Sequence, residues 1–319
     1  MDTIYIYASG NDSLGMGHLR RSINLANILR NKNAKQNIFF FGDYSEFAKD
    51  FLSKYHFQFF SISLLEFINK ADSYQGIFVI IDSYQLTDLL YKKLNQNNVR
   101  WGAIDDFNQF NFEGAKFVIN FRIGVKPVYK SNLSLIGPTF MPLDTELDQA
   151  KQYRNNSPKS NKVLICIGSS DIYNIGTKIA KKLATRFSQF EWILISNEQI
   201  ADVKQKNLTV LPKTNTIYQI MKDIKFLISG GGGIKYESCY LSIPTLVYSQ
   251  SEGELSDTKI LESFNMIING DKASNYTDDL TISHFENLIK SETSLEESCK
   301  SIFIENNNQN LYQKLYPLI

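Results

Sequence analysis

The sequence predicts an α/β protein with two domains, each built on a parallel β-sheet. Short apolar runs suited to buried strands alternate with segments of helical period, first over residues 3–119 and again over 162–264. A polar stretch with two early prolines, residues 138–160, separates the two series. Alternating strands and helices are typical of parallel sheets covered by helices, and 319 residues are enough for two such domains.

The first series predicts an N-terminal domain over residues 1–145. Its expected strands are short runs rich in β-branched and aromatic residues, at 3–8, 37–41, 57–62, 77–82, 99–104 and 116–119. The clearest helices between them are amphipathic segments at 17–30 and 86–96. Four apolar side chains at helical spacing predict the buried face of the first helix: Leu19, Ile23, Ala26 and Leu29.

The second series predicts a nucleotide-binding domain over residues 161–300, joined to the first by a linker at 146–160. Its expected strands lie at 162–167, 191–195, 207–211, 225–229 and 244–248. Its expected helices lie at 175–187, 215–222, 233–241 and 256–264. Residues 280–319 also read as helices, and we expect a C-terminal helix at 301–319 to pack back on the first domain.

Composition and charge exclude several classes of function. A net charge of +1 argues against a nucleic-acid-binding surface. The three cysteines, Cys166, Cys239 and Cys299, are isolated, which favours reduced thiols in the cytoplasm over disulfides, and no zinc-ligand spacing is present. The sequence shows neither the basic start of a signal peptide nor an apolar run of membrane-spanning length. We expect a cytoplasmic protein without a metal, a monomer or weak oligomer.

A glycine turn precedes the first expected helix and places a histidine at its start. Gly15 and Gly17 allow a sharp turn and a close approach to a ligand, and His18 follows directly. Arg21 lies one helical turn later on the same face. The positive end of the helix dipole favours a neutral imidazole, which can accept a proton from water or a hydroxyl. His18 is therefore a candidate general base, and the alternative is a histidine that only caps and packs the turn.

Two further glycine turns follow strands of the second half. Gly231, Gly232 and Gly233 belong to a run of four glycines that opens a helix, and free backbone N–H groups there suit a diphosphate. Lys235 could neutralise the phosphates and Glu237 could bind ribose hydroxyls. The alternatives are a flexible loop and solvated side chains. A weaker candidate follows the first strand of this half and contributes Gly168, Ser169 and Asp171.

Five short elements at strand ends, spread over most of the chain, match a family pattern. They are Gly15–Arg21, Asp82-Ser83-Tyr84, Ile104-Asp105-Asp106, Gly137–Leu143 and Gly168–Asn174. Together with the tetraglycine segment they resemble the UDP-2,4-diacetamido-trideoxy-sugar hydrolases of pseudaminic acid synthesis. More distantly, the chain resembles the MurG-like glycosyltransferases of the GT-B fold.

The resemblance implies two Rossmann-like domains facing a cleft, with a UDP-sugar as the substrate and no cofactor. It implies that water displaces UDP from C1 of the sugar in nonulosonic acid or surface-polysaccharide synthesis. His18, as the base, and Tyr84, beside the sugar, would be the catalytic residues, and Gly15, Gly17 and Arg21 would contribute to substrate binding. Asp105 would contribute to binding. The residues alone leave open that Tyr84 only packs and that Asp105 only caps a loop.

Several positions depart from the family pattern. No acid stands within residues 7–11, Gly233 replaces a serine, Phe121-Arg122 replaces Gln-Asn, and residues 249–254 replace an Asn-Gln pair. Two alternatives to hydrolysis therefore stay open. One is a glycosyltransferase that uses a sugar hydroxyl in place of water, and the other is a non-catalytic nucleotide-sugar-binding protein.

Overall fold

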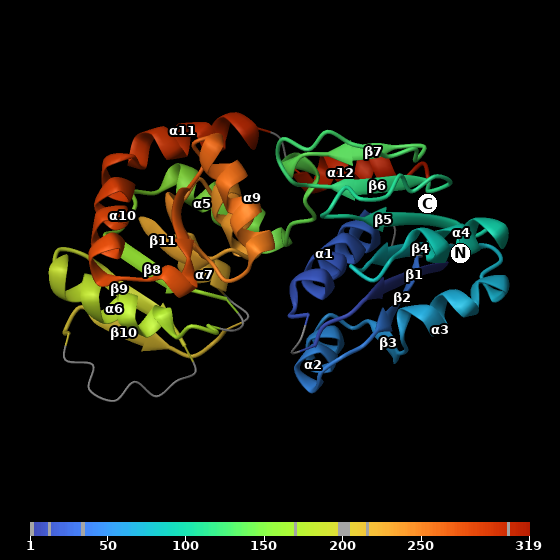
Figure 1. Ribbon diagram of the computed structural model, residues 1–319, viewed down its shortest axis with the longest axis horizontal. Coiled ribbons are helices and arrows are strands. Elements are labelled where there is room, and N and C mark those ends of the chain that lie inside the picture. The colour runs from blue at the N-terminus through green and yellow to red at the C-terminus, as the bar shows by residue number, and fades with distance from the viewer. Residues whose placement is uncertain are drawn as a thin grey trace. The chain divides into compact units, whose positions relative to one another are not determined.

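The computed structural model describes residues 3–11, 14–32, 36–168, 171–196, 205–214, 217–304 and 307–319 (Figure 1). The chain forms two compact units, which are described one at a time. Unit 1 comprises Met1–Asp144 and Glu305–Ile319, and unit 2 comprises Thr145–Ile304.

Unit 1 contains a seven-stranded parallel sheet in the order β3-β2-β1-β4-β5-β6-β7. The strands are β1 (Thr3–Ala8), β2 (Asn37–Gly42), β3 (Gln58–Ser61), β4 (Ile77–Asp82), β5 (Arg100–Ile104), β6 (Phe117–Asn120) and β7 (Ser134–Ile136). The strand order reverses between β1 and β4, whose last residues, Ala8 and Asp82, lie opposite each other. Ligands of such sheets bind at the carboxyl ends of the strands at this reversal.

Helices cover the sheet of unit 1. They are α1 (Gly17–Lys32), α2 (Glu46–Lys54), α3 (Leu64–Asn69), α4 (Asp88–Gln96) and α12 (Asn307–Leu315), with short 3₁₀ helices at Ala71–Ser73 and Pro138–Phe140. The predicted apolar stripe of α1 is confirmed, because all four of its side chains are at most 1% exposed. The C-terminal helix α12 is tied to this unit: the Asn308 side chain bonds both the N–H and the carbonyl of Leu143, and Asn307 donates to the Pro138 carbonyl.

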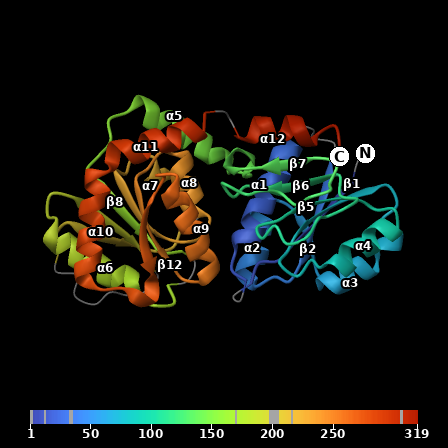
Figure 2. The same cartoon turned by 45° about the horizontal axis from the view of Figure 1, so that its top comes forward.

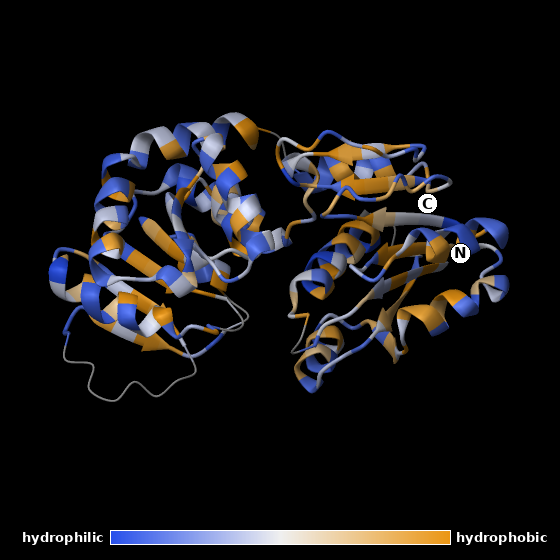
Figure 3. Cartoon of the chain, in the orientation of Figure 1, coloured by the Kyte–Doolittle hydropathy of each residue, from blue (hydrophilic) through white to orange (hydrophobic). Residues whose placement is uncertain are grey.

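Unit 2 contains a six-stranded parallel sheet in the order β10-β9-β8-β11-β12-β13. The strands are β8 (Lys162–Cys166), β9 (Glu191–Ile195), β10 (Leu208–Leu211), β11 (Phe226–Gly230), β12 (Thr245–Ser249) and β13 (Ile268–Lys272). The order reverses between β8 and β11. Figure 3 colours much of both sheets as hydrophobic, as expected for parallel strands buried on both faces.

The helices of unit 2 lie around its sheet (Figure 2). They are α5 (Thr145–Asn156), α6 (Ile175–Arg186), α7 (Ile217–Met221), α8 (Ile234–Tyr240), α9 (Glu252–Ser263), α10 (Asp278–Lys290) and α11 (Glu292–Ile302), with a 3₁₀ helix at Ala273–Asn275. An aromatic cluster holds α10 to the sheet, because the Phe285 ring lies 5.1 Å from that of Trp192 and 5.8 Å from that of Phe226.

The strands predicted from the sequence are confirmed, each to within one residue at either end. The prediction missed β7, which has three residues, and β13, whose sequence INGDK is mostly polar. It also missed the helices α2 and α3, and it began α9 four residues late.

The structure differs from the expected linker at 146–160, because α5 covers residues 145–156 within unit 2. Arg154 explains this placement. It is 8% exposed and donates to the carbonyls of Leu241 (3.0 Å), Ile224 (2.7 Å) and Met221 (3.2 Å). The burial of its guanidinium lowers the pKa of Arg154 to about 10. Three buried carbonyls of unit 2 thus depend on one side chain of the segment.

We expect Arg154→Met to lower the free energy of unfolding by about 2–4 kcal/mol, because it leaves these carbonyls without their donor. Urea denaturation followed by circular dichroism measures the change. Arg186→Met is the matched control, because the Arg186 side chain is 61% exposed and only 3.9 Å from its partner Glu286. That control should stay within about 0.5 kcal/mol of wild type, and equal losses in the two variants would contradict the assignment.

Candidate active site

The first glycine turn of unit 1 connects β1 to α1 at the reversal of strand order. Gly15 has a φ of +72°, in the left-handed region, and its N–H bonds the Asn11 carbonyl at 2.8 Å. The Asn11 side chain accepts from the N–H of Leu14 at 2.8 Å. These two hydrogen bonds fix the turn that leads into α1, which begins at Gly17. His18, the next residue, lies beside the end of β4.

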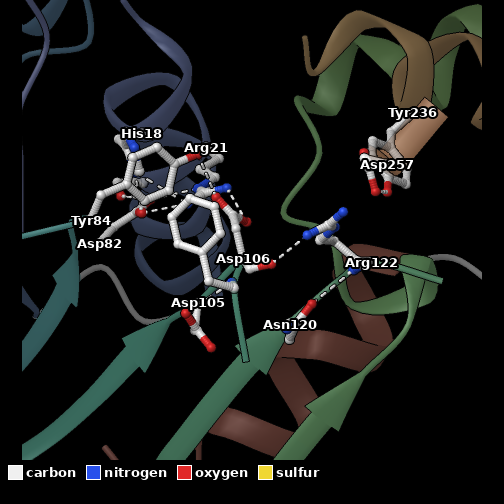
Figure 4. Close-up of polar contacts among 12 residues, drawn as sticks. His18, Arg21, Asp82, Tyr84, Asp105, Asp106, Asn120, Arg122, Tyr236 and Asp257 are labelled. Carbon is white, nitrogen blue, oxygen red and sulfur yellow. Dashed lines mark hydrogen bonds and ion pairs between the residues drawn. The ribbon is translucent and has the colours of Figure 1, made fainter. Parts of the chain in front are cut away.

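His18 and Asp82 form a buried pair (Figure 4). The distance from His18 Nδ1 to Asp82 Oδ1 is 2.6 Å, and the two residues are 5% and 0% exposed. A carboxylate oxygen this close requires a proton on Nδ1, so in the neutral ring Nε2 keeps its lone pair. Within the described residues, Nε2 has no hydrogen-bond partner. The pair therefore presents a nitrogen that can accept a proton.

Asp82 is the centre of the polar network. Arg21 donates to both carboxylate oxygens of Asp82, from Nε and from Nη2, at 2.6 Å each. The Ser22 hydroxyl donates to Asp82 Oδ2 at 3.1 Å. Burial would raise the pKa of Asp82, but the charge of Arg21, together with His18, outweighs burial and holds the pKa of this carboxyl well below its usual range. Asp82 is therefore an anion that orients the imidazole.

Tyr84 lies against His18 and is held by Asp106. The two rings meet edge to face with centroids 4.1 Å apart, and the Tyr84 hydroxyl donates to Asp106 Oδ2 at 2.9 Å. Arg21 Nη1 donates to the other oxygen of Asp106 at 2.8 Å. Burial and the Asp106 carboxylate raise the pKa of Tyr84, so its phenol stays protonated. The Tyr84 side chain is half-exposed and can contact a ligand beside the imidazole.

Asp105 supports the loop after β5, as the capping alternative predicts. Its carboxylate accepts from the N–H groups of Phe107 (3.1 Å) and Asn108 (2.8 Å) and from the Tyr129 hydroxyl (2.6 Å). In Figure 4 it points away from Arg21. The structure thus brings Asp106, rather than Asp105, to His18 and Tyr84. The sequence analysis assigns no role to Asp82 or Asp106, although both belong to short elements at the carboxyl ends of apolar strands, which is the available signal.

The tetraglycine turn of unit 2 follows β11, next to the reversal between β8 and β11. A Cβ atom on Gly230 would lie 2.0 Å from the Ile167 carbonyl oxygen, and one on Gly231 would lie 2.7 Å from Glu254 Cβ, so both positions require glycine. Next to Gly232 there is open space. The described residues offer no acceptor for the N–H groups of Gly232 and Gly233, which can therefore meet an anion.

Lys235 and Glu237 lie inside unit 2 rather than on its surface. Lys235 is 2% exposed, pairs with Asp257 at 2.8 Å and bonds the Gly231 carbonyl. Glu237 is 7% exposed and accepts from the Tyr218 hydroxyl at 3.0 Å. Both side chains are therefore buried, and the alternative that they are solvated at the surface is wrong. The ammonium of Lys235 is committed to Asp257 and to the Gly231 carbonyl, and its expected contact with phosphate stays a prediction.

The remaining glycine turn of unit 2 lies between β8 and α6. The Asp171 carboxylate accepts from the N–H groups of Ile175 (3.0 Å) and Gly176 (2.7 Å). It therefore occupies two of the free N–H groups at the start of α6. Gly168 has a φ of +125° in the turn before it. Ser169 lies outside the described residues.

Among the described residues, no group of three or more histidine, cysteine, aspartate or glutamate side chains could hold a metal ion. No helix within the described ranges is both long enough and apolar enough to cross a membrane.

Comparisons with solved structures identify the fold. MurG of Acinetobacter baumannii is 12% identical, with a TM-score of 0.72 over 99% of both chains. UGT2 of Phytolacca americana, solved with UDP-2-fluoro-glucose and pterostilbene, is 9% identical, with a TM-score of 0.71 over 99% of this chain and 98% of that one. The chain has the GT-B fold.

Comparisons with sequences are less specific. No family model matches the chain. This chain is 23% identical over 274 residues to MJ1062, an uncharacterized protein of Methanocaldococcus jannaschii. The match covers 78% of this chain and 56% of that protein, so the chain spans little more than half the length of this relative.

The pKa of Asp82 predicts how acid affects stability. Its pKa is lower in the folded than in the unfolded chain, where it is about 3.9, so its charge stabilises the fold above about pH 4 and loses this effect as the pH falls further. We expect Asp82→Asn to cost about 3–5 kcal/mol at pH 7, because Arg21 loses a buried partner, and clearly less at pH 2–3.

Urea denaturation of both proteins at several pH values between 2 and 7 measures this difference. Asp50→Asn is the control, because Asp50 is exposed on α2, and it should stay within about 0.5 kcal/mol of wild type throughout. A cost of Asp82→Asn that does not change with pH would contradict the assigned charge.

Proposed function

We propose that the chain acts on a nucleotide sugar and that His18 is its general base. The observation that carries this proposal is the buried His18–Asp82 pair, which leaves Nε2 able to take a proton at the strand-order reversal of unit 1. Asp82 fixes the tautomer and the ring orientation, as the carboxylate does in Ser-His-Asp triads. The GT-B fold supports the choice of substrate, because UGT2, a protein of the same fold, was solved with a UDP-sugar analogue.

The reaction that we propose is hydrolysis at C1 of the sugar. Nε2 of His18 takes a proton from water while the water oxygen bonds to C1. The bond from C1 to the diphosphate oxygen breaks, and its electron pair leaves with UDP. The resemblance to UDP-2,4-diacetamido-trideoxy-sugar hydrolases supports this class of sugar, and the half-exposed Tyr84 ring beside His18 offers a contact for it.

The N–H groups of Gly232 and Gly233 are proposed to bind the diphosphate. Hydrogen-bond donors fixed where charge develops stabilise a departing anion without rearrangement. Gly230 and Gly231 fix the turn, since a Cβ atom fits at neither position. Gly15 and Gly17 shape the other turn, and Arg21 holds Asp82 in place.

Glycosyl transfer is the second candidate. The same base can take a proton from a sugar hydroxyl in place of water. The solved structures that are similar to this chain, MurG among them, include transferases. Arg122, which departs from the hydrolase pattern, bonds the Asp106 carbonyl at 2.8 Å next to the site. A changed residue at this position supports keeping the transferase as an alternative.

We expect His18→Ala to lower the rate of UDP release from UDP-sugars by about 10²–10⁴-fold, the range for the loss of a general base. Asp82→Asn should also slow release strongly, because it loses the anion that orients the ring. His56→Ala is the matched control, since His56 lies on an exposed turn of the same unit. UDP release that is unaffected by His18→Ala would contradict the assignment.

Water enriched in ¹⁸O separates the two candidates. Hydrolysis by attack at C1 should place one ¹⁸O in the released sugar and none in UDP, as measured by mass spectrometry. A transferase should release UDP only when an acceptor sugar is supplied. Calorimetric binding of UDP without turnover of any donor would instead indicate a non-catalytic binding protein.

A further inference from the structure

Two half-exposed aromatic side chains lie next to the candidate base of unit 1. Tyr84, which follows β4, and Phe107, which follows β5, are 53% and 45% exposed, and their ring centroids are 4.6 Å apart. Tyr84 also contacts the His18 ring, with centroids 4.1 Å apart (Figure 4). A single apolar side chain on a surface needs no explanation, whereas two that pack together beside convergent polar groups indicate a binding surface.

Hydrogen bonds to the two aspartates after β5 restrain both aromatic residues. The Tyr84 hydroxyl donates to Asp106 at 2.9 Å, and Arg21 donates to the other oxygen of the same carboxylate at 2.8 Å. The backbone N–H of Phe107 donates to Asp105 at 3.1 Å. A ligand therefore meets two rings that are already ordered, so little of its affinity is lost in ordering them.

The two rings offer a ligand apolar surface rather than hydrogen bonds. The side chain of Phe107 has no polar atom, and the Tyr84 hydroxyl uses its proton on Asp106. A hollow of about 20 Å³ is lined by both rings and by Asp106, among other residues, and has room for a group the size of water or a methyl. A sugar ring is too large for this hollow and has to lie across the exposed part of the aromatic rings.

We propose that Phe107, together with Tyr84, selects UDP-linked 6-deoxy sugars over the same sugars with a hydroxyl at C6. This inference rests on the proposed function. The faces of aromatic rings carry partial negative charge and attract polarised C–H groups. Loss of the hydroxyl at C6 leaves a methyl group, which suits both the rings and the size of the hollow. A hydroxyl at the same place gives up its water and gains no hydrogen bond from Phe107, which costs affinity.

Calorimetry with UDP-2-acetamido-2,6-dideoxyglucose and with UDP-N-acetylglucosamine tests this inference, because the two ligands differ only in the hydroxyl at C6. We expect the wild-type protein to bind the deoxy sugar about three- to tenfold more tightly. In Phe107→Ala the two Kd values should agree to within about twofold, since the variant loses half of the apolar surface. Phe107→Tyr keeps the ring and should keep the preference. Phe107 is half-exposed and its N–H bond to Asp105 survives in both variants, so the local fold is kept.

Phe264→Ala is the matched control, because Phe264 is also 45% exposed but follows the end of α9 in unit 2, the helix that runs back from the carboxyl end of β12. It should leave the preference unchanged. Equal affinities in the wild-type protein, or an equal loss of affinity for both ligands in Phe107→Ala, would overturn the inference but not the proposed function. A preference for the deoxy sugar without UDP release from either ligand would support the inference and contradict hydrolysis. Binding of neither ligand would overturn both.

Discussion

The burial of the Asp82 carboxylate is the constraint on which the candidate site depends. A fully buried carboxylate is costly unless cations and hydrogen-bond donors surround it, and α1 supplies Arg21, His18 and Ser22 for this purpose. The same contacts therefore hold α1 against the end of β4 and assign the proton of the imidazole to Nδ1. Fold stability and the chemical state of His18 follow from one interaction, which explains why a charged group is retained in the interior.

Unit 2 buries a cation near its glycine turn, whereas unit 1 buries an anion. Lys235 is buried, so Asp257 and the Gly231 carbonyl must satisfy its ammonium, and that carbonyl is drawn toward the interior. The open side of the turn is left with backbone N–H groups beside Gly232, where a Cβ atom would meet nothing within 4 Å. The turn can therefore bind an anion through backbone dipoles, while the ammonium of Lys235 is committed to Asp257.

The sequence predicts the architecture better than the site, for a physical reason. Buried parallel strands such as FVII of β4 must be apolar along their length, so hydrophobic runs mark them, whereas the polar edge strand INGDK does not carry this signal. His18 was found because a glycine turn and a helix start mark it locally. Asp105 was chosen over Asp106 because neighbouring aspartates look alike in sequence until the backbone decides which one faces Arg21. Asp82 was noted in its motif but was given no role, because its contacts with His18 and Arg21 join residues more than 60 positions apart. The inward position of Lys235 depends on Asp257, a residue 22 positions away in the sequence.

The arrangement of charges also bears on how the bond to the diphosphate could be broken. With the ammonium of Lys235 committed to Asp257, the proposed donors to a departing diphosphate are the N–H groups of Gly232 and Gly233. Activation of the nucleophile is the other contribution that the proposed reaction requires. A base whose tautomer is fixed by a buried, fully ionised carboxylate is suited to that task. The buried pair of His18 and Asp82 in unit 1 suits the activation of a nucleophile in the proposed reaction, whether that nucleophile is water or a sugar hydroxyl.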